Sequence, residues 1–350
     1  TTGTLPIAAL LRVAHAAGEA LAAAGRADAR LDLRLSGAQA HLAAAPTRHA
    51  FAGAFVLPAL SPETTPPPLG PSRVRRALFF ESLMASDQPH NDTELSQGVL
   101  HLVSGLRGTG TEVVLARVKM PIEGVERGIE GLDSVAAALR GGPIGLVCIT
   151  LLEGYWEGVV QLIGRLRDLG CRAHIAVGGV MPTLTPEQVA AHLPEVTFIC
   201  RGAGEGLVPA LCRILGETDA DSPLTDAQHA HLLGLDGLIA IDRAAPGGPC
   251  LLSARSDRVL EVDDPDQTTL DLRHLAPRHL VNGVELVTSK GCIHRCTFCT
   301  IIGRESYQAR SAEGTLALLA RYDAHYQTIF PAGPPSNAFR LHLADDDFAC

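Results

Sequence analysis

Between residues 74 and 215 the sequence alternates five times between a short apolar run and a longer stretch with the apolar spacing of a helix. The expected strands cover 76–83, 111–120, 144–150, 173–177 and 196–200. The expected helices lie within 95–106, 125–139, 156–169, 186–192 and 207–215. Right-handed crossovers between successive strands place helices on both faces of a parallel sheet. The pattern therefore predicts a doubly wound, Rossmann-like α/β domain over residues 74–215.

Glycines follow the last two of these expected strands. Gly178 and Gly179 come after the fourth strand, and Gly202, Gly204 and Gly206 come after the fifth. Ligands of doubly wound sheets bind beyond the carboxyl ends of the strands. Glycine allows the backbone to approach a bulky ligand closely. The sequence thus predicts a ligand site at this edge of the sheet.

The regions that flank this domain have different patterns. Residues 1–50 are rich in Ala and Leu and predict helices, and six prolines over 58–73 interrupt any regular element. We therefore expect residues 1–73 to form a small helical N-terminal segment that ends in a proline-rich linker. Residues 216–280 are polar and rich in Asp and Pro, which predicts a linker with minor strands.

After the linker the strand and helix pattern returns. A strand is expected over 284–289, a helix over 312–326 and a further strand over 339–343. Residues 281–350 are therefore predicted to begin a second β/α array.

The charge balance and the cysteine content narrow the class of protein. There are 29 Lys and Arg residues against 38 Asp and Glu residues, so the chain lacks the excess of positive charge that nucleic-acid binding favours. No apolar run reaches the roughly 18 residues needed to span a bilayer, and the N-terminus lacks the pattern of a signal peptide. The nine cysteines are odd in number and scattered. We expect a cytoplasmic protein with no disulfide framework, no membrane partner and no nucleic-acid partner.

Three of the cysteines form a compact motif. Cys292, Cys296 and Cys299 have the spacing C-x3-C-x2-C within the segment SKGCIHRCTFCTI, which follows an expected strand. An ordinary iron–sulfur cluster takes four cysteines, so three thiolates leave one iron open to chelate S-adenosylmethionine (SAM). A zinc site with His294 as fourth ligand and a set of buried structural cysteines are the alternatives. The other six are expected to be small buried hydrophobes: Cys148, Cys171, Cys200, Cys212, Cys250 and Cys350.

The motif resembles the hallmark of the radical SAM superfamily, in which CxxxCxxC follows the first strand of a (β/α) barrel. The resemblance implies a 4Fe-4S cluster on the three cysteines and SAM as cofactor. It also implies that Phe298 lies near the adenine and that Asp345, Asp346 and Asp347 contact the methionine amino group. A hydrophobic anchor for the loop and a solvated acidic turn remain the alternatives for these residues. A complete barrel needs on the order of 200 residues, so residues 281–350 correspond only to its first part, and the remainder of the barrel is missing.

Residues 74–215 resemble the cobalamin-binding domain that precedes many radical SAM barrels. Three segments carry the resemblance: IGLVCIT (144–150), VGGVMPTLTPE (177–187) and FICRGAGEG (198–206). It implies that cobalamin contacts Thr150, Gly178, Gly179, Gly202, Gly204 and Glu205. A generic nucleotide-binding domain is the alternative. The loop after the first strand has Asp87 and His90 but lacks the glycine of the DxHxxG pattern. The resemblance to radical SAM relatives implies a lower face of cobalamin without a histidine ligand, with His90 as a surface residue, and a ligand role for His90 is the alternative.

Together the two resemblances imply a cobalamin-dependent radical SAM methyltransferase that acts on an unactivated carbon of a small molecule or natural product. They imply a low-potential electron donor, such as flavodoxin or ferredoxin, as partner. No catalytic residue beyond the cofactor ligands is assigned. A cyclase or ring-contraction enzyme that does not transfer a methyl group is the alternative within enzymes. A cobalamin carrier or sensor without catalysis is the alternative outside them.

Overall fold

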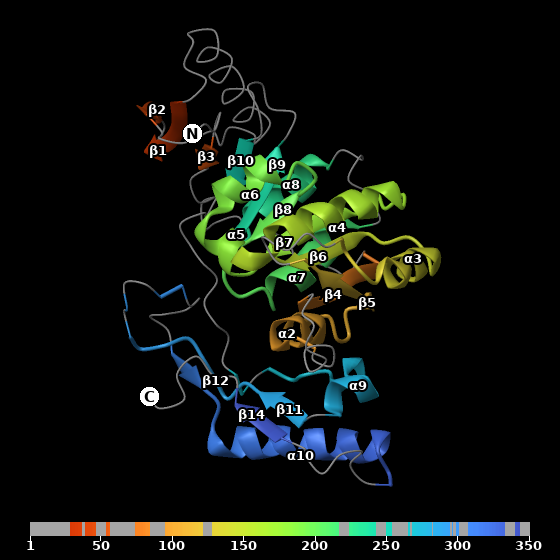
Figure 1. The fold of residues 1–350 in the computed structure, drawn as a ribbon. Coiled ribbons are helices and arrows are strands. Elements are labelled where there is room, and N and C mark those ends of the chain that lie inside the picture. Colours follow the sequence, from red (N-terminus) through yellow and green to blue (C-terminus); the bar gives the residue numbers. More distant parts are fainter. Residues whose placement is uncertain are drawn as a thin grey trace.

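The structure is a computed structural model, shown in Figure 1, and it covers the strands and helices of two successive α/β units. The described residues are 29–36, 39–46, 54–56, 74–84, 95–121, 128–216, 224–242, 250–253, 265–266, 268–281, 283–294, 296, 299–300, 307–332 and 340–343.

Five parallel strands lie side by side at one end of an eight-stranded sheet. They are β4 (Arg76–Met84), β5 (Glu112–Met120), β6 (Leu146–Thr150), β7 (His174–Gly178) and β8 (Phe198–Cys200). Their order in space is β5-β4-β6-β7-β8, which is the 2-1-3-4-5 order of one common doubly wound sheet. The predicted mixed α/β fold with a mainly parallel, Rossmann-like sheet is confirmed.

Helices cover both faces of this sheet (Figure 1). On one face lie α2 (Gln97–Gly105) and α7 (Leu207–Leu215), and on the other lie α3 (Leu132–Arg140), α4 (Trp156–Asp168) and α6 (Pro186–His192). A short helix, α5 (Val180–Leu184), follows β7. Each of these helices except α5 falls within a predicted helical segment.

Alternate strand residues point into the two cores. Phe79 of β4 packs in the core beneath α2 and α7, whereas Leu78 and Phe80 pack against α3, α4 and α6. In β6, Cys148 packs in the core beneath α2 and α7, and Val147 packs in the core on the other face. A strand that is buried on both faces needs apolar residues at every position, which explains the unbroken apolar run that predicted β6.

The sheet continues beyond β8 with strands from distant parts of the chain. They are β9 (Leu238–Asp242), β10 (Cys250–Ser253) and β3 (Ala54–Val56), and β9 runs antiparallel to β8. Residues 216–280, expected to form a linker with minor strands, supply β9 and β10 and also a helix, α8 (Asp226–Leu233). Thr225 caps α8, since its side chain accepts a hydrogen bond from the backbone N–H of Gln228.

The prediction of helices over residues 1–50 is wrong for the part that the structure describes. Here β1 (Ala29–Ser36) and β2 (Gln39–Pro46) form an antiparallel pair, with Ser36 opposite Gln39. The physical reason lies in residues 29–36, where leucines alternate with charged residues at a period of two, the period of a strand. The high Ala content of the surrounding sequence favoured helix and concealed this signal. Residues 1–28 lie outside the described residues.

The C-terminal unit is a β-α-β arrangement. Strands β11 (Gly283–Leu286) and β14 (Arg340–Leu343) pair in parallel, and α10 (Ala312–Ile329) lies between them in sequence. These elements agree with the predicted strand, helix and strand. Two short strands, β12 (Ser289–Lys290) and β13 (Gln308–Ala309), pair antiparallel between β11 and α10. They close the base of the loop that carries the three cysteines of the motif.

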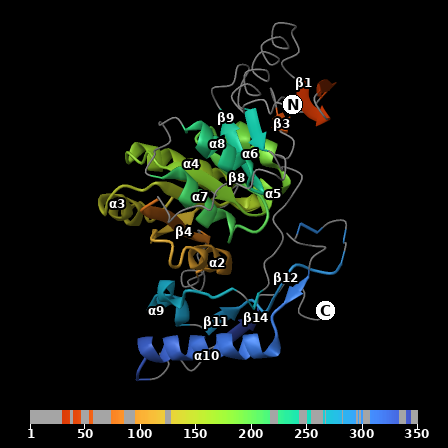
Figure 2. The same cartoon turned by 180° about the vertical axis from the view of Figure 1, so that it is seen from behind.

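Helix α2 lies between the central sheet and the C-terminal unit in both views (Figures 1 and 2). Its apolar core is continuous with side chains of the C-terminal part of the chain, which are Leu270, Leu280, Val284, Leu286, Leu318 and Tyr322. The side chain of Gln97 donates a hydrogen bond of 3.1 Å to the carbonyl oxygen of Glu285 in β11. The C-terminal unit is thus packed directly on the helix that borders the expected ligand site.

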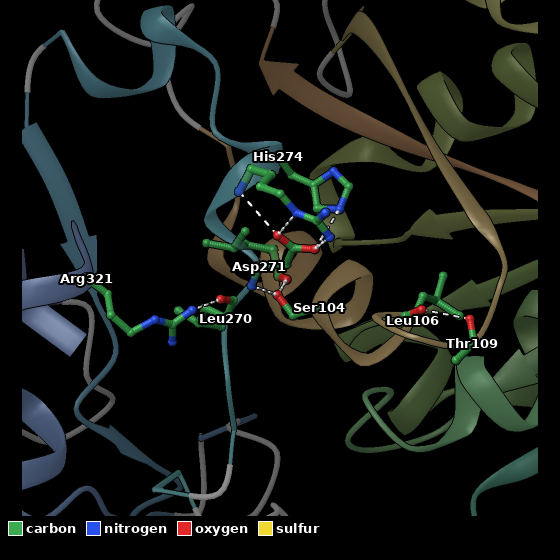
Figure 3. A network of polar contacts seen from close by, with 9 residues as sticks. Ser104, Leu106, Thr109, Leu270, Asp271, His274 and Arg321 are labelled. Carbon is green, nitrogen blue, oxygen red and sulfur yellow. Dashed lines mark hydrogen bonds and ion pairs between the residues drawn. The ribbon is translucent and has the colours of Figure 1, made fainter. Parts of the chain in front are cut away.

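Polar contacts hold the segment before β11 on α2 (Figure 3). The backbone N–H of Asp271 donates to the buried hydroxyl of Ser104 at 2.7 Å, and this hydroxyl donates to the carbonyl of Leu100. The guanidinium group of Arg321 in α10 donates to the carbonyl of Leu270. Arg273 lowers the pKa of the Asp271 carboxyl to about 2 by hydrogen bonding, against the opposing effect of burial.

A second polar contact joins β4 to the short helix α9 (Pro277–Leu280). The buried Glu81 carboxylate accepts hydrogen bonds from the Arg278 guanidinium at 2.6 and 2.8 Å, and the His279 Nε2 atom lies 3.1 Å from it.

In the described part of the chain, no helix combines the length and the apolar character that crossing a bilayer requires.

Candidate functional site

A cavity of about 370 Å³ opens at the carboxyl ends of β6, β7 and β8, between α2 and α7. Its walls are mainly apolar. Its rim carries the polar side chains of Thr150, Glu205 and Lys290. The apolar residues that line it include Phe79, Phe80, Val99, Leu102, Ile149, Val177 and Val208. This is the edge of the sheet at which the sequence predicts a ligand.

The structure brings together all of the residues expected to contact a cofactor on the sheet. The lining of this one cavity includes Thr150, Gly178, Gly179, Gly202, Gly204 and Glu205. Thr150 and Gly178 are the last residues of β6 and β7, Gly179 follows β7, and the other three lie in the loop after β8. Their convergence follows from the parallel sheet, which aligns the carboxyl ends of neighbouring strands.

Two of the glycines have a steric reason to be glycine. Gly179 has a φ of +105°, and a Cβ atom there would lie 3.1 Å from the carbonyl oxygen of Leu151. A Cβ atom on Gly204 would lie 2.6 Å from the side chain of Leu102 in α2. The space beside both glycines is thus already filled by neighbouring atoms, so a side chain at either position would strain the backbone or displace Leu102.

Sequence reasoning missed two residues of this cavity, Lys290 and Gly291, which lie directly before the first cysteine of the motif. Lys290 Nζ lies 2.5 Å from Glu205 Oε1, and the two side chains are only 16% and 18% exposed. The only feature of the sequence that singles out Lys290 is that the chain has just two lysines, Lys119 and Lys290. Nothing in the sequence indicates that residue 290 returns to the loop after β8.

His101 of α2 completes a buried polar group around Glu205. Its Nδ1 atom lies 3.8 Å from Glu205 Oε1 and, within the described residues, has no hydrogen-bond partner. Burial, together with the positive charge of Lys290, lowers the pKa of His101 to about 4, so the imidazole is neutral at pH 7. Burial tends to raise the pKa of Glu205. Lys290 outweighs this effect through its positive charge and its hydrogen bond, and the pKa of Glu205 is lowered. The cavity rim therefore holds a carboxylate paired with an ammonium group.

The cysteine loop starts within this rim. Cys292 is buried, and its sulfur accepts a hydrogen bond of 3.4 Å from the backbone N–H of His294. Cys296 is exposed and Cys299 is half-buried, and the Cys299 N–H donates to the Cys296 carbonyl at 3.1 Å. Among the described residues, which include all three cysteines, no group of three or more His, Cys, Asp or Glu side chains is arranged to hold a metal ion. The donors for an iron–sulfur cluster are present on one closed loop, but they do not converge into a preformed site for a cluster or for zinc.

Several predicted site residues lie outside the described residues. They are Phe298, Asp345, Asp346 and Asp347, and the loop with Asp87 and His90.

Four of the remaining cysteines are buried, as predicted for small hydrophobic residues: Cys148, Cys171, Cys200 and Cys212. Burial raises the pKa of the Cys200 and Cys212 thiols to about 12. Cys148 and Cys200 also line the cavity, where they contribute apolar surface.

Comparison with known families assigns the part of the chain that forms this cavity. Residues 94–212 match the family model of the B12 binding domain. A search of curated proteins finds no match to the chain. Residues 94–212 therefore form a B12-binding domain, and the predicted cobalamin is the cofactor that this domain supports. The match covers α2, the first part of α7 and every residue predicted to contact cobalamin, and it ends before the cysteine loop.

Proposed function

We propose that the chain is part of a cobalamin-dependent radical SAM enzyme, and that this enzyme methylates an unactivated carbon of a small molecule. One observation carries the proposal. The base of the three-cysteine loop, at Lys290 and Gly291, lines the cavity of a B12-binding domain. A cofactor in the cavity and a cluster on the loop would then be neighbours, which is what a reaction that uses both requires.

The cavity suits part of a cobalamin molecule. Its volume of about 370 Å³ is at the lower end of the roughly 300–1,000 Å³ typical of small-molecule pockets. Cobalamin is larger than this, so the cavity would hold only part of the molecule. Thr150, Gly178, Gly179, Gly202, Gly204 and Glu205 are the proposed contacts.

Cys292, Cys296 and Cys299 are the proposed ligands of the 4Fe-4S cluster. Because the three thiols do not converge, cluster loading has to reorganise the loop, and metal binding is then coupled to local folding. When bound, the cluster with SAM supplies a 5′-deoxyadenosyl radical, and cobalamin supplies the methyl group. Phe298 and Asp345–Asp347 remain the predicted SAM contacts, and flavodoxin or ferredoxin the predicted electron donor.

The loop geometry also favours a second candidate, a cobalamin carrier or sensor without a cluster. Its supporting observation is that the thiols are spread between buried and exposed positions.

One anaerobic preparation separates the two candidates. The chain is reconstituted with iron, sulfide and hydroxocobalamin and examined by ultraviolet–visible and electron paramagnetic resonance spectroscopy. The Cys296→Ser variant serves as the control. The radical SAM proposal expects both a corrin spectrum and a cluster signal, with the cluster signal lost in the variant. A corrin spectrum without a cluster supports the carrier, and the absence of both rejects the two candidates. Addition of SAM and reductant should then give a product heavier by one methylene group; an unchanged mass indicates the rearrangement alternative.

A further inference from the structure

The cobalamin cavity is completed by residues from outside the B12-binding domain. The family match ends at residue 212, yet Lys290 and Gly291 line the cavity together with residues of the domain. We propose that Lys290 and Gly291 belong to the cobalamin site, and that the Lys290–Glu205 ion pair couples cobalamin binding to the conformation of the cysteine loop. The inference rests on the proposed function, because it assumes that cobalamin occupies this cavity.

The Glu205 end of the ion pair is held in place by close backbone packing. A Cβ atom on Gly105 of α2 would lie 2.6 Å from the Glu205 carbonyl oxygen. A Cβ atom on the neighbouring Gly204 would meet Leu102 of α2 at the same distance. The loop after β8 thus packs closely against α2. The backbone N–H of Val208 in α7 also donates a hydrogen bond of 3.0 Å to the Gly204 carbonyl, which holds the residue next to Glu205 in place.

The Lys290 end is fixed by the ladder at the base of the cysteine loop. Lys290 in β12 is paired with Gln308 in β13, and the N–H of Arg310 donates to the Thr288 carbonyl at 2.7 Å. Two residues after Lys290 the chain reaches Cys292. The ion pair therefore connects a fixed point on the rim of the cavity to the residue from which the three-cysteine loop departs.

A cofactor over this rim changes the environment of the pair. It removes water from side chains that are already only 16% and 18% exposed. Two charges in such a place are tolerated only when they remain together, because an unpaired buried charge is strongly unfavourable. Cobalamin therefore favours the loop position in which Lys290 reaches Glu205. By thermodynamic reciprocity, this loop position favours cobalamin to the same degree.

The test measures methylcobalamin affinity in the dark by equilibrium dialysis, using the full chain without iron. We expect Lys290→Met and Glu205→Gln each to weaken binding about tenfold, within the roughly 5–150-fold range of coupled sites. The double variant should weaken it no further, since either change removes the same pair. The matched control is Arg278→Met. Arg278 forms another ion pair between the sheet and the C-terminal part of the chain, with Glu81 at 2.6 Å, and neither residue lines the cavity. It should leave the affinity unchanged.

A second measurement follows the cysteine loop directly. Cys296 is exposed, so its alkylation by iodoacetamide, followed by mass spectrometry, reports on the loop. Saturating methylcobalamin should slow this alkylation severalfold in the unmodified chain, and in Lys290→Met it should have no effect. The inference is overturned if the unmodified chain binds methylcobalamin but neither the variants nor the alkylation rate respond. Failure of the unmodified chain to bind methylcobalamin overturns the proposed function itself.

Discussion

Glu81 offers a quantitative test of the contact between the central sheet and the C-terminal part of the chain. Its side chain is buried on β4, where Arg278 and His279 of α9 surround the carboxylate. Burial alone would raise the pKa of this carboxyl. The hydrogen bonds from His279 and Arg278, with their charges, outweigh burial and lower its pKa from 4.5 to about 2. A difference of this size corresponds to roughly 3 kcal/mol of stability at neutral pH.

The sign of the pH dependence follows from the lowered pKa. In the unfolded chain the carboxyl titrates near 4.5 and in the folded protein near 2, so the stabilisation is complete well above pH 4.5. As the pH falls from about 5 towards 2, the unfolded state takes up a proton that the folded state does not, and the stabilisation is lost.

The perturbation is Glu81→Gln, which keeps the size of the side chain and removes its charge. We expect the free energy of unfolding in urea to fall by about 3 kcal/mol at pH 7 and by only about 1 kcal/mol at pH 3, where the folded carboxyl is still mostly ionised. Arg165→Met is the matched control, because it removes an exposed partner of Asp168 and should change stability by less than about 1 kcal/mol at either pH. Equal losses at pH 7 and pH 3 for Glu81→Gln would show that the carboxylate charge is not what stabilises this contact.

Three further predictions concern α2 and the buried thiols. Gly105→Ala should lower stability by about 1–3 kcal/mol, because its Cβ atom would meet the Glu205 backbone. Gly164→Ala is the control: its Cβ atom has open space, so it should raise stability by up to about 1 kcal/mol. Urea unfolding of both variants measures these changes. Ser104→Ala should reduce stability by about 1–3 kcal/mol, because the buried N–H of Asp271 loses its acceptor; a loss below about 0.5 kcal/mol in the same assay contradicts this. At pH 8 iodoacetamide should modify the exposed Cys296 and leave the buried Cys200 unmodified, because burial raises the pKa of Cys200 to about 12. Peptide mass spectrometry before and after unfolding distinguishes the two thiols.

The central sheet could be predicted from the sequence because its signals are local. Residues 144–149 carry no polar side chain, and the structure places Leu146–Thr150 as β6, whose first four residues are buried. Helices α6 and α7 have the limits that their apolar spacing predicts. The glycines of the cavity followed from the same pattern, since residues after successive parallel strands gather at one edge of the sheet, whereas Thr150 and Glu205 were implied by the resemblance to cobalamin-binding domains.

The errors arise where local composition and tertiary pairing disagree. At β1 the alternation of leucines with charged residues was the informative signal, and the surrounding alanines obscured it. The strand β9 is short and apolar in sequence, but only the antiparallel pairing of Phe198 with Ala240 shows that it extends the sheet. Such pairing is decided by packing against residues far along the chain, which spacing within a segment does not report.

Lys290 and Glu205 illustrate the same limit at the functional site. They are 85 positions apart, and neither lies in a pattern that requires the other. Their contact exists because the C-terminal unit packs on α2, and that packing depends on residues spread over several elements. Sequence reasoning therefore predicted Glu205 and the glycines that line the cavity, but not that Lys290 pairs with Glu205, and the role of the three cysteines stays a prediction.

Helix α2 is the element through which the two halves of the site are mechanically connected. Val99 and Leu102 of this helix line the cavity. On the same helix, Gln97 is hydrogen-bonded to β11 and Ser104 to the segment before it. A helix is stiff over this length, because each turn is hydrogen-bonded to the next. A ligand that displaces α2 would therefore also displace β11 and the segment before it, which lead into the cysteine loop. The loop thus has two connections to the cavity: one runs through α2, and the other is the Lys290–Glu205 ion pair.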